Sequence, residues 1–134
     1  MLQYKEFNSG LLNEIKEIYK EQDWTAYLQD DEKLMRAFEN SLYLYGAFDE
    51  NKLIGFVRCV GDGEHILLIQ DLIVKSAYQR QGIGTILLRH IFEKYAGVRM
   101  LSLYTDGSDE RANNFYRNIG MKLVEEYQTV SYMR

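Results

Sequence analysis

Apolar residues follow two different spacings along the chain, and the change between them marks out the expected elements. Short, nearly continuous apolar runs predict strands at Leu42–Phe48, Leu53–Val60 and Ile66–Val74. The residues at 49–52 and 61–64 separate these runs and are typical of turns. We therefore expect an antiparallel meander in the middle of the chain.

Helical spacing, with apolar residues three and four positions apart, occurs on both sides of this meander. It predicts helices over four stretches: residues 11–19, 30–41, 83–95 and 109–118. Shorter apolar stretches predict four more strands: Tyr4–Phe7, Met100–Thr105, Met121–Glu126 and Gln128–Met133. The expected order is β-α-α-β-β-β-α-β-α-β-β, an α/β (α+β) fold in a single domain over residues 1–134.

Composition narrows the classes of partner. The chain has 16 basic and 20 acidic residues and no basic cluster, so we expect no nucleic-acid partner. Gln70 and Asp71 interrupt the strongest apolar run before it reaches membrane-spanning length, so we expect a soluble protein with no membrane partner. The lone Cys59 favours a buried packing role in a reducing cytoplasm, and no spacing of residues predicts a metal site. His90 is expected at the surface or in packing.

A glycine-containing loop joins the strand at 66–74 to the helix at 83–95. Its sequence is Gln79-Arg80-Gln81-Gly82-Ile83-Gly84. Two glycines at the start of a helix can expose backbone N–H groups to a phosphate, although glycines in such loops often serve only the turn. The third glycine of a dinucleotide-binding loop and the lysine of a Walker loop are both absent, which weakens those two interpretations.

This loop, following Leu72-Ile73-Val74, resembles the acetyl-CoA signature Gln/Arg-x-x-Gly-x-Gly/Ala of the GNAT family of N-acetyltransferases. A second segment, residues 109–121, is similar to the family pattern Asn-x-x-Ala-x-x-Leu/Phe-Tyr-x-x-x-Gly-Phe. The order of elements also matches over nearly the whole chain. The resemblance implies a mixed sheet in which the strands Ile66–Val74 and Met100–Thr105 run parallel and splay apart, with acetyl-CoA in the gap.

The resemblance also implies which residues would hold acetyl-CoA, the acetyl donor. Backbone groups of Leu72, Ile73 and Val74 would pair with the pantetheine arm. The pyrophosphate would be held at the loop and helix start, by Gln79, Arg80, Gln81, Gly82, Ile83, Gly84 and Thr85. Asp109 stands where the family has asparagine; it can cap the last helix but cannot donate a hydrogen bond. Asn113 is an alternative partner for the pantetheine arm, or an exposed helix amide.

Tyr116 matches the family tyrosine that protonates the departing thiolate, although a tyrosine at this position can also serve the core. The base is less well defined. Gln70 shares a strand face with Leu68 and Leu72, cannot titrate, and is expected to orient a water or the acceptor. Asp71, on the opposite face, is a candidate base or a structural carboxylate. An acceptor amine of low pKa, deprotonated through water, would need no base.

Trp24 and Tyr27 lie beside several acidic residues between the first two helices and could take a cationic amine, or could pack those helices onto the sheet. The sequence therefore predicts an acetyl-CoA-dependent N-acetyltransferase that transfers acetyl directly to a primary amine of a small molecule or peptide. The alternative is a non-catalytic acyl-CoA-binding or sensing domain of the same fold. A homodimer is also expected from the family, with Tyr127 and Tyr132 as interface residues or ordinary sheet residues.

Overall fold

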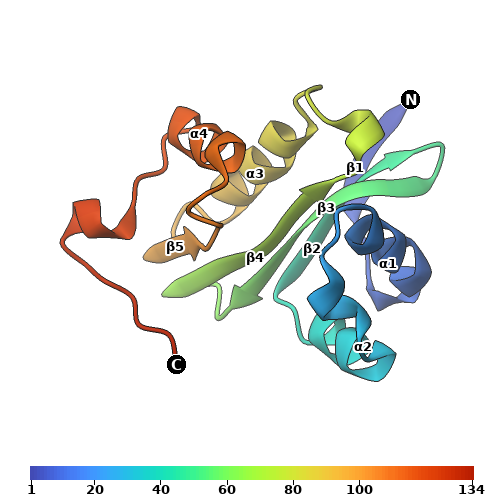
Figure 1. Cartoon of the computed structure of the whole chain (residues 1–134), viewed down its shortest axis with the longest axis horizontal. Coiled ribbons are helices and arrows are strands. Elements are labelled where there is room, and N and C mark those ends of the chain that lie inside the picture. Colours follow the sequence, from blue (N-terminus) through green and yellow to red (C-terminus); the bar gives the residue numbers. More distant parts are fainter. The chain divides into compact units, whose positions relative to one another are not determined.

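The computed structural model describes residues 1–134, which group by their contacts into two compact units, Met1–Leu103 and Tyr104–Arg134. The first unit contains five strands and three α-helices (Figure 1). Their bounds are β1 Leu2–Glu6, α1 Leu12–Glu21, α2 Asp31–Glu39, β2 Tyr43–Asp49, β3 Lys52–Gly61, β4 Ile66–Val74, α3 Ile83–Lys94 and β5 Met100–Leu103. The second unit contains one α-helix, α4 Glu110–Asn118.

The strands form one mixed sheet in the order β1-β2-β3-β4-β5. The first four pair antiparallel, which confirms the predicted meander, and β5 pairs parallel with β4. The parallel pairing runs from Ile66 opposite Met100 to Ile69 opposite Leu103, where β5 ends. Residues 70–74 of β4 therefore have β3 on one side and no strand on the other, as the predicted separation of these two strands requires.

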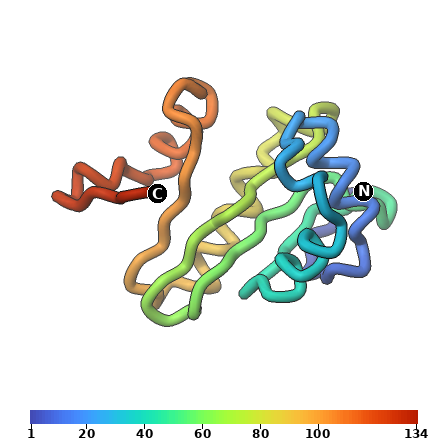
Figure 2. The backbone as a smooth tube through the Cα atoms, turned by 60° about the horizontal axis from the view of Figure 1, so that its bottom comes forward, coloured from blue at the N-terminus to red at the C-terminus, as the bar shows by residue number.

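Helices cover both faces of the sheet. Figures 1 and 2 show α1 and α2 on one face and α3 on the other. Each helix is amphipathic and buries its apolar side, which is the pattern expected of helices that pack on a sheet. The core beneath α1 and α2 consists of Ile15, Ile18, Tyr19, Leu34, Phe38, Leu44, Phe48, Leu53, Phe56 and Ile73. The buried residues of α3 are Ile83, Leu87, Leu88 and Ile91.

A β-bulge interrupts the pairing of β3 with β4. Arg58 pairs with Asp71 and Cys59 with Ile69, so Gln70 has no residue of β3 opposite it. Strict alternation along the strand predicted Gln70 and Asp71 on opposite faces. That prediction is wrong, because the extra residue locally resets the alternation and both side chains reach the tyrosines of the α1 and η2 segments. The segment η2, Thr25–Leu28, is a short 3-10 helix between α1 and α2.

The two strands predicted near the C-terminus, Met121–Glu126 and Gln128–Met133, are not present. Val124–Tyr127 forms a short 3-10 helix instead, and β5 ends at Leu103 before the predicted Thr105. The Leu123 N–H donates to the Glu126 carboxylate and the Gln128 N–H to the Glu125 carbonyl, so a local turn takes up backbone groups that a strand would offer to a neighbour. Tyr127 and Tyr132 are exposed rather than packed in a sheet.

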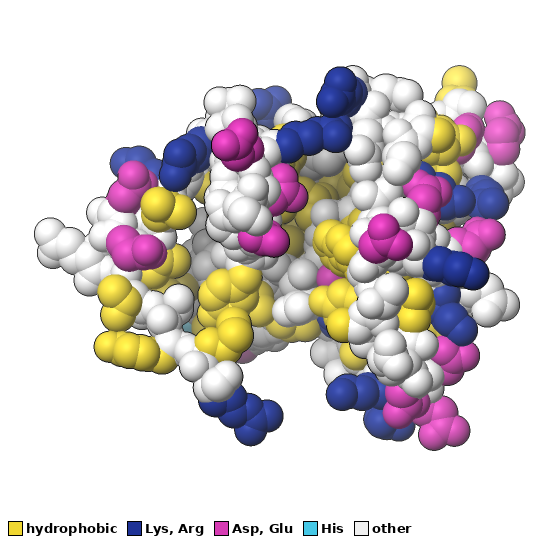
Figure 3. Space-filling model, viewed as in Figure 1, with side chains coloured by type: hydrophobic (Ala, Val, Ile, Leu, Met, Phe, Trp, Pro, Cys, Tyr) yellow, Lys and Arg dark blue, Asp and Glu magenta, His cyan; other side chains and the backbone are white.

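Acidic and basic side chains are mixed over α1 and α2 on the face seen in Figure 3, without a large patch of one sign. None of the helices combines the length and the apolar character that crossing a membrane requires.

Candidate active site

The unpaired edge of β4 presents backbone groups of alternate residues. The Lys75 N–H donates across the ladder to the Ile54 carbonyl at 2.9 Å, so Lys75 directs its backbone toward β3. Because direction alternates along an antiparallel strand, Ile73 also faces β3, whereas Leu72 and Val74 face the open edge. Of the three residues predicted to pair with pantetheine, only Leu72 and Val74 have suitably directed backbone groups.

Beyond this edge, the loop at 79–85 bends through two left-handed residues. Arg80 has φ 65° and Gly82 has φ 82°. Gly82 is the N-cap of α3, and no side chain caps this helix end. The Ile86 N–H donates to the Gly82 carbonyl at 3.1 Å, so the N–H groups of residues 83–85 precede the first bond of this helix. Such an end carries positive potential and can hold an anion.

Gly82 also leaves room beside the loop. A Cβ placed there meets no atom within 4 Å, so the glycine is required by its backbone conformation and not by a close neighbour. Open space next to unpaired N–H groups is what a bulky phosphate needs.

The segment that leads from β4 into the loop is tied to the end of α1 by polar side chains. The Glu21 carboxylate accepts the Ser76 N–H at 2.6 Å, which lowers the pKa of Glu21. Gln22 donates to the Ser76 hydroxyl at 3.0 Å. The first residue of the glycine signature, Gln79, donates through Nε2 to the Val74 carbonyl at 2.8 Å. The side chain of Gln79 thus joins the open edge of β4 to the loop, whereas the residues that follow Gln79 offer backbone N–H groups.

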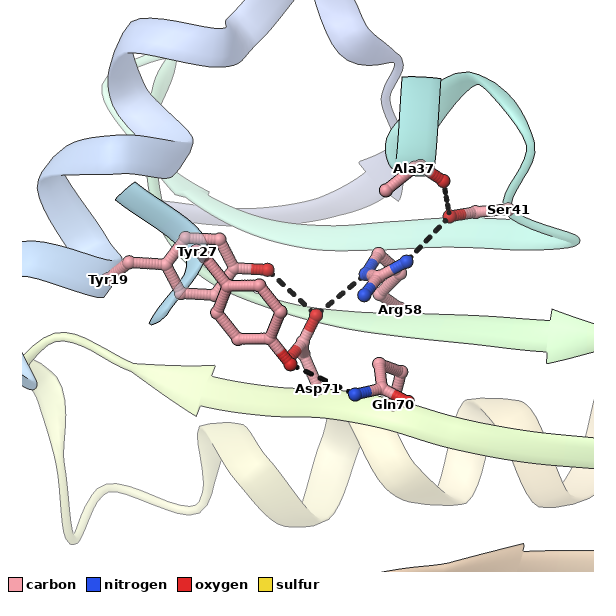
Figure 4. A network of polar contacts seen from close by, with 7 residues as sticks. All are labelled: Tyr19, Tyr27, Ala37, Ser41, Arg58, Gln70 and Asp71. Carbon is pink, nitrogen blue, oxygen red and sulfur yellow. Dashed lines mark hydrogen bonds and ion pairs between the residues drawn. The ribbon is translucent and has the colours of Figure 1, made fainter. Parts of the chain in front are cut away.

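A buried ion pair lies under the middle of β4 (Figure 4). Asp71 Oδ2 accepts from Arg58 Nε at 2.7 Å and from the Tyr19 hydroxyl at 2.7 Å. Arg58 and Asp71 are only 5% and 1% exposed. Burial, followed by the charge of Asp71, raises the pKa of Tyr19, so this hydroxyl remains a donor. These contacts favour the interpretation of Asp71 as a structural carboxylate over that of a base.

The ion pair has one unfilled position. Asp71 Oδ1 is buried and has no hydrogen-bond partner. On the other side of the pair, Arg58 Nη1 donates to the Ser41 hydroxyl at 3.3 Å, and Ser41 donates to the Ala37 carbonyl at 2.8 Å. The guanidinium also lies 5.0 Å from the centre of the Phe38 ring. Arg58 is therefore held by three residues, Asp71, Ser41 and Phe38, whereas Asp71 Oδ1 has no donor.

Gln70 and Tyr27 extend this network to the surface. Gln70 Nε2 donates to the Tyr27 hydroxyl oxygen at 2.9 Å, and the Gln70 side chain is exposed. Tyr27 stacks on Tyr19 with ring centres 4.5 Å apart, and Trp24 stacks on Tyr19 at 6.1 Å. Tyr27 is half-buried and Trp24 is 36% exposed. Tyr27 and Trp24 therefore both pack onto α1, as the packing interpretation of these residues predicted, and both remain partly exposed at the surface.

Sequence patterns assigned Tyr19 only to the apolar face of a helix, and they missed Arg58. A signal was present, since Arg58 and Asp71 are single charged residues in two consecutive apolar runs. Neighbouring antiparallel strands can pair such residues, but the register that joins them is not visible in either run alone.

Comparison with known proteins supports the family resemblance. The model of the acetyltransferase (GNAT) family matches residues 11–121. The chain belongs to the GNAT family. A relative is N-acetyltransferase ycf52 of Gracilaria tenuistipitata var. liui, described as uncharacterized, which is 27% identical over 124 residues. The match covers 87% of this chain and 65% of the relative, so the chain spans about two-thirds of that protein's length.

Solved structures of GNAT proteins share the fold. A GNAT family acetyltransferase from Streptococcus pneumoniae TIGR4 has a TM-score of 0.84 and 29% identity, covering 100% of this chain and 97% of that chain. The PaiA N-acetyltransferase of Thermoplasma acidophilum, solved in complex with coenzyme A, has a TM-score of 0.75 and 20% identity, covering 91% and 90%. The expected fold class and family are therefore confirmed.

The second GNAT motif lies in the unit Tyr104–Arg134. The Asp109 carboxylate accepts the Ala112 N–H at 3.0 Å, which confirms that it caps α4. Asn113 Nδ2 donates to the carbonyls of Asp106 and Asp109 at 3.0 and 2.7 Å, so its amide holds the preceding turn. Tyr116 is half-buried, and burial followed by the charge of Asp109 raises its pKa. Its hydroxyl is therefore protonated at neutral pH.

Two other residues singled out in the sequence serve packing. Cys59 is fully buried, as predicted, and burial raises the pKa of its thiol to about 12. His90 Nε2 lies 2.9 Å from the Tyr43 hydroxyl, and the imidazole stacks on Tyr45 with ring centres 3.7 Å apart. No group of three or more His, Cys, Asp or Glu side chains is arranged to bind a metal ion.

Proposed function

We propose that the protein is an acetyl-CoA-dependent N-acetyltransferase that transfers acetyl directly to a primary amine of a small molecule or peptide. The observation that carries this proposal is the combination of the uncapped start of α3 with the unpaired edge of β4. One supplies N–H groups for a pyrophosphate, and the other supplies a strand edge to which an extended amide-containing arm can add. Membership in the GNAT family supports the same donor.

We assign each part of this site a role in binding the acetyl donor. The pyrophosphate binds the N–H groups of the loop at 80–85, and the pantetheine amides pair with Leu72 and the Val74 N–H. The Val74 carbonyl is already engaged by Gln79. In the second unit, the side chains of Asp109 and Asn113 hold the turn before α4. We therefore propose that these two residues fix the shape of this turn and do not bind the donor through their side chains.

In the transfer itself, the neutral amine attacks the thioester carbonyl carbon and forms the C–N bond. The nitrogen of the tetrahedral intermediate then gives up one proton to water, and the intermediate loses the thiolate as its C–S bond breaks. Tyr116 protonates that thiolate and regains a proton from water, a role that fits the raised pKa of this half-buried residue. We assign no covalent enzyme intermediate, because Cys59 is buried in the core and protonated.

An acceptor amine that arrives as an ammonium ion must lose a proton before its nitrogen can attack. Asp71 is the charge partner of Arg58, so we assign the deprotonation to water and an acceptor amine of low pKa, with Gln70 orienting the water or the acceptor. The exposed face of Trp24 and the edge of Tyr27 form the acceptor side.

The competing function is acyl-CoA binding without turnover. It is favoured by the absence of a titratable side chain at Leu68 and Gln70, and by the occupation of Asp71 in an ion pair. Calorimetry with acetyl-CoA and release of free thiol in the presence of amines separate the two functions. The amines are kanamycin, spermidine and a short peptide with a free N-terminus.

Thiol release with at least one amine supports catalysis. Tyr116→Phe is expected to lower kcat by about 100-fold or more while the acetyl-CoA Kd changes less than about twofold. Tyr127→Phe, at an exposed tyrosine of the same unit, is the matched control and leaves both values unchanged. Tight acetyl-CoA binding with no thiol release from any amine would establish the sensing domain instead.

Location and assembly complete the proposal. The buried, unpaired Cys59 is typical of a reducing compartment, and we assign the protein to the cytoplasm. We also propose that residues 1–134 act as one acetyltransferase domain and form a homodimer, which light scattering of the purified protein tests directly.

A further inference from the structure

Three side chains, Glu21, Gln22 and Gln79, form a hydrogen-bonded row that we call the amide row. Glu21 is the last residue of α1, and Gln22 follows it. Glu21 Oε1 accepts from Gln22 Nε2 at 3.3 Å, and Gln22 Oε1 accepts from Gln79 Nε2 at 3.4 Å. Gln79 Nε2 also donates to the Val74 carbonyl at 2.8 Å. The amide row therefore connects the end of α1 to the open edge of β4.

The carboxylate at the start of the amide row fixes the direction of both amides. A carboxylate only accepts, so Gln22 turns Nε2 toward Glu21. The second hydrogen of this nitrogen goes to the Ser76 hydroxyl at 3.0 Å. Gln22 then has only its carbonyl oxygen left for Gln79. Gln79 in turn presents Nε2, because its Oε1 would face two acceptors, the carbonyl oxygens of Gln22 and Val74.

The carbonyl oxygen of Gln79 is the free end of the amide row. Both hydrogens of Gln79 Nε2 are engaged, whereas Oε1 accepts from no group of the protein. Gln79 is half-buried, and its Oε1 is not among the enclosed side-chain atoms that lack a partner. Hydrogen-bonded amides polarise one another, and the negative charge of Glu21 at the far end strengthens the acceptor at the near end. Gln79 therefore occupies one acceptor of the strand edge, the Val74 carbonyl, and offers another beside it.

We propose that Gln79 Oε1 accepts an amide N–H of the pantetheine arm, and that Glu21 and Gln22 position it for this contact. The arm then pairs with the Val74 N–H and with the Gln79 oxygen, which stands in for the engaged Val74 carbonyl. Gln79 is thus a donor-binding residue, and Glu21 and Gln22 are positioning residues. This inference rests on the proposed use of acetyl-CoA, and it assigns Gln79 to the pantetheine arm rather than to the pyrophosphate.

Nuclear magnetic resonance of the Gln79 side-chain amide tests the amide row with and without coenzyme A. The two Nε2 protons are identified by their loss in Gln79→Leu. In the free wild-type protein both are expected to exchange slowly with solvent, and Gln22→Leu is expected to speed the exchange of one of them. Coenzyme A is expected to shift both resonances while the protons stay protected, because the new bond forms at Oε1.

Two results of this experiment would overturn the proposal. Fast exchange of both protons in the free protein would show that the amide row does not form in solution. Release of the Nε2 protons by coenzyme A would show that the pantetheine arm displaces Gln79 from the Val74 carbonyl. Absence of acetyl-CoA binding to the wild-type protein would overturn the proposed function and this contact with it, whereas binding with released protons overturns the contact alone.

Affinities provide the second measurement. Gln22→Leu is expected to raise the acetyl-CoA Kd about threefold to tenfold in calorimetry, the effect of one weakened hydrogen bond. ADP has a pyrophosphate but no pantetheine arm, so its Kd is expected to stay unchanged, as measured from the shifts of the first N–H groups of α3. Gln29→Leu is the matched control, at an exposed glutamine whose Nε2 donates to the Thr25 carbonyl, and it leaves both Kd values unchanged.

The comparison of the two ligands separates positioning from a purely structural role. An equal rise in Kd for acetyl-CoA and ADP would show that Gln22 acts only through the shape of the loop, and an unchanged acetyl-CoA Kd would contradict any role of the α1 end. Where ADP binds too weakly to measure, the response of the Gln79 protons to coenzyme A decides.

Discussion

Two regions next to β4, the loop at 79–85 and the buried cluster of Asp71, Arg58 and Tyr19, which we call the corner, are held in shape by different forces. The loop depends on backbone conformation, with left-handed residues at Arg80 and Gly82 and exposed side chains at Arg80 and Gln81. The corner depends on side chains that bind one another inside the protein. A loop of the first kind can hold a ligand through backbone groups, which every residue has. A corner of the second kind can recognise a ligand only through its particular set of side chains.

The largest effect is expected from breaking the corner at Arg58. Arg58→Met leaves the Asp71 charge buried with the Tyr19 hydroxyl as its remaining donor, which is expected to lower the free energy of unfolding by about 3–5 kcal/mol. Urea unfolding followed by circular dichroism measures the change. Lys16→Met is the matched control, because Lys16 pairs with Asp31 at the surface at 2.8 Å and such pairs contribute about 0–1 kcal/mol. Equal losses in the two variants would show that burial gives the Arg58 pair no special weight.

A smaller effect on stability, but a direct one on the loop, is expected from Gly82→Ala. The new Cβ meets no atom, so the penalty is only that of a left-handed backbone, about 1–2 kcal/mol. The shift of the first N–H groups of α3 is expected to raise the acetyl-CoA Kd about tenfold, measured by calorimetry. Gly97→Ala is the matched control, since Gly97 has the same open surroundings without a positive φ. Unchanged affinity in Gly82→Ala would mean that the loop backbone does not hold the donor.

The smallest effect concerns the β3–β4 turn, where backbone conformation and a carboxylate act together. Gly61 and Gly63 have positive φ, and Asp62 Oδ1 accepts the N–H groups of Glu64, His65 and Ile66 at 2.8, 2.8 and 3.0 Å. These bonds lower the pKa of Asp62 from 3.8 to about 2. A carboxylate with a lowered pKa in the folded state stabilises the protein above its ordinary pKa and loses that contribution as the pH falls.

Asp62→Asn is therefore expected to be less stable than the wild-type protein by a constant amount above pH 5. The difference should shrink as the pH falls from about 4 to about 2, where Asp62 becomes protonated. Urea midpoints at a series of pH values measure it. A difference that stays constant down to pH 2 would show that the charge of Asp62 does not stabilise the turn.

Sequence patterns predicted the loop well because its requirements are local. A strand, two glycines and a helix start follow one another along the chain, and the resulting geometry needs no distant partner. The corner could not be predicted in the same way. Asp71 meets Arg58 and Tyr19 only through the register of β3 with β4 and the packing of α1. The bulge at Gln70 depends on a mismatch between two strands that neither strand shows alone.

The missing C-terminal strands have a related cause. Residues 121–133 have enough apolar positions to suggest strands, but strand formation needs a neighbour that accepts and donates along the whole segment. The local hydrogen bonds of Leu123 and Gln128 compete with such pairing, and propensity alone does not reveal them.

The bulge in β4 also bears on how a protein of this kind can change over generations. Arg58 and Asp71 are cross-strand partners, so a new residue at one requires a compensating residue at the other. Gln70 has no residue opposite it in β3, and a substitution there removes no cross-strand pair from the sheet. Descendants can therefore exchange this side chain while inheriting the same pairing of β3 with β4.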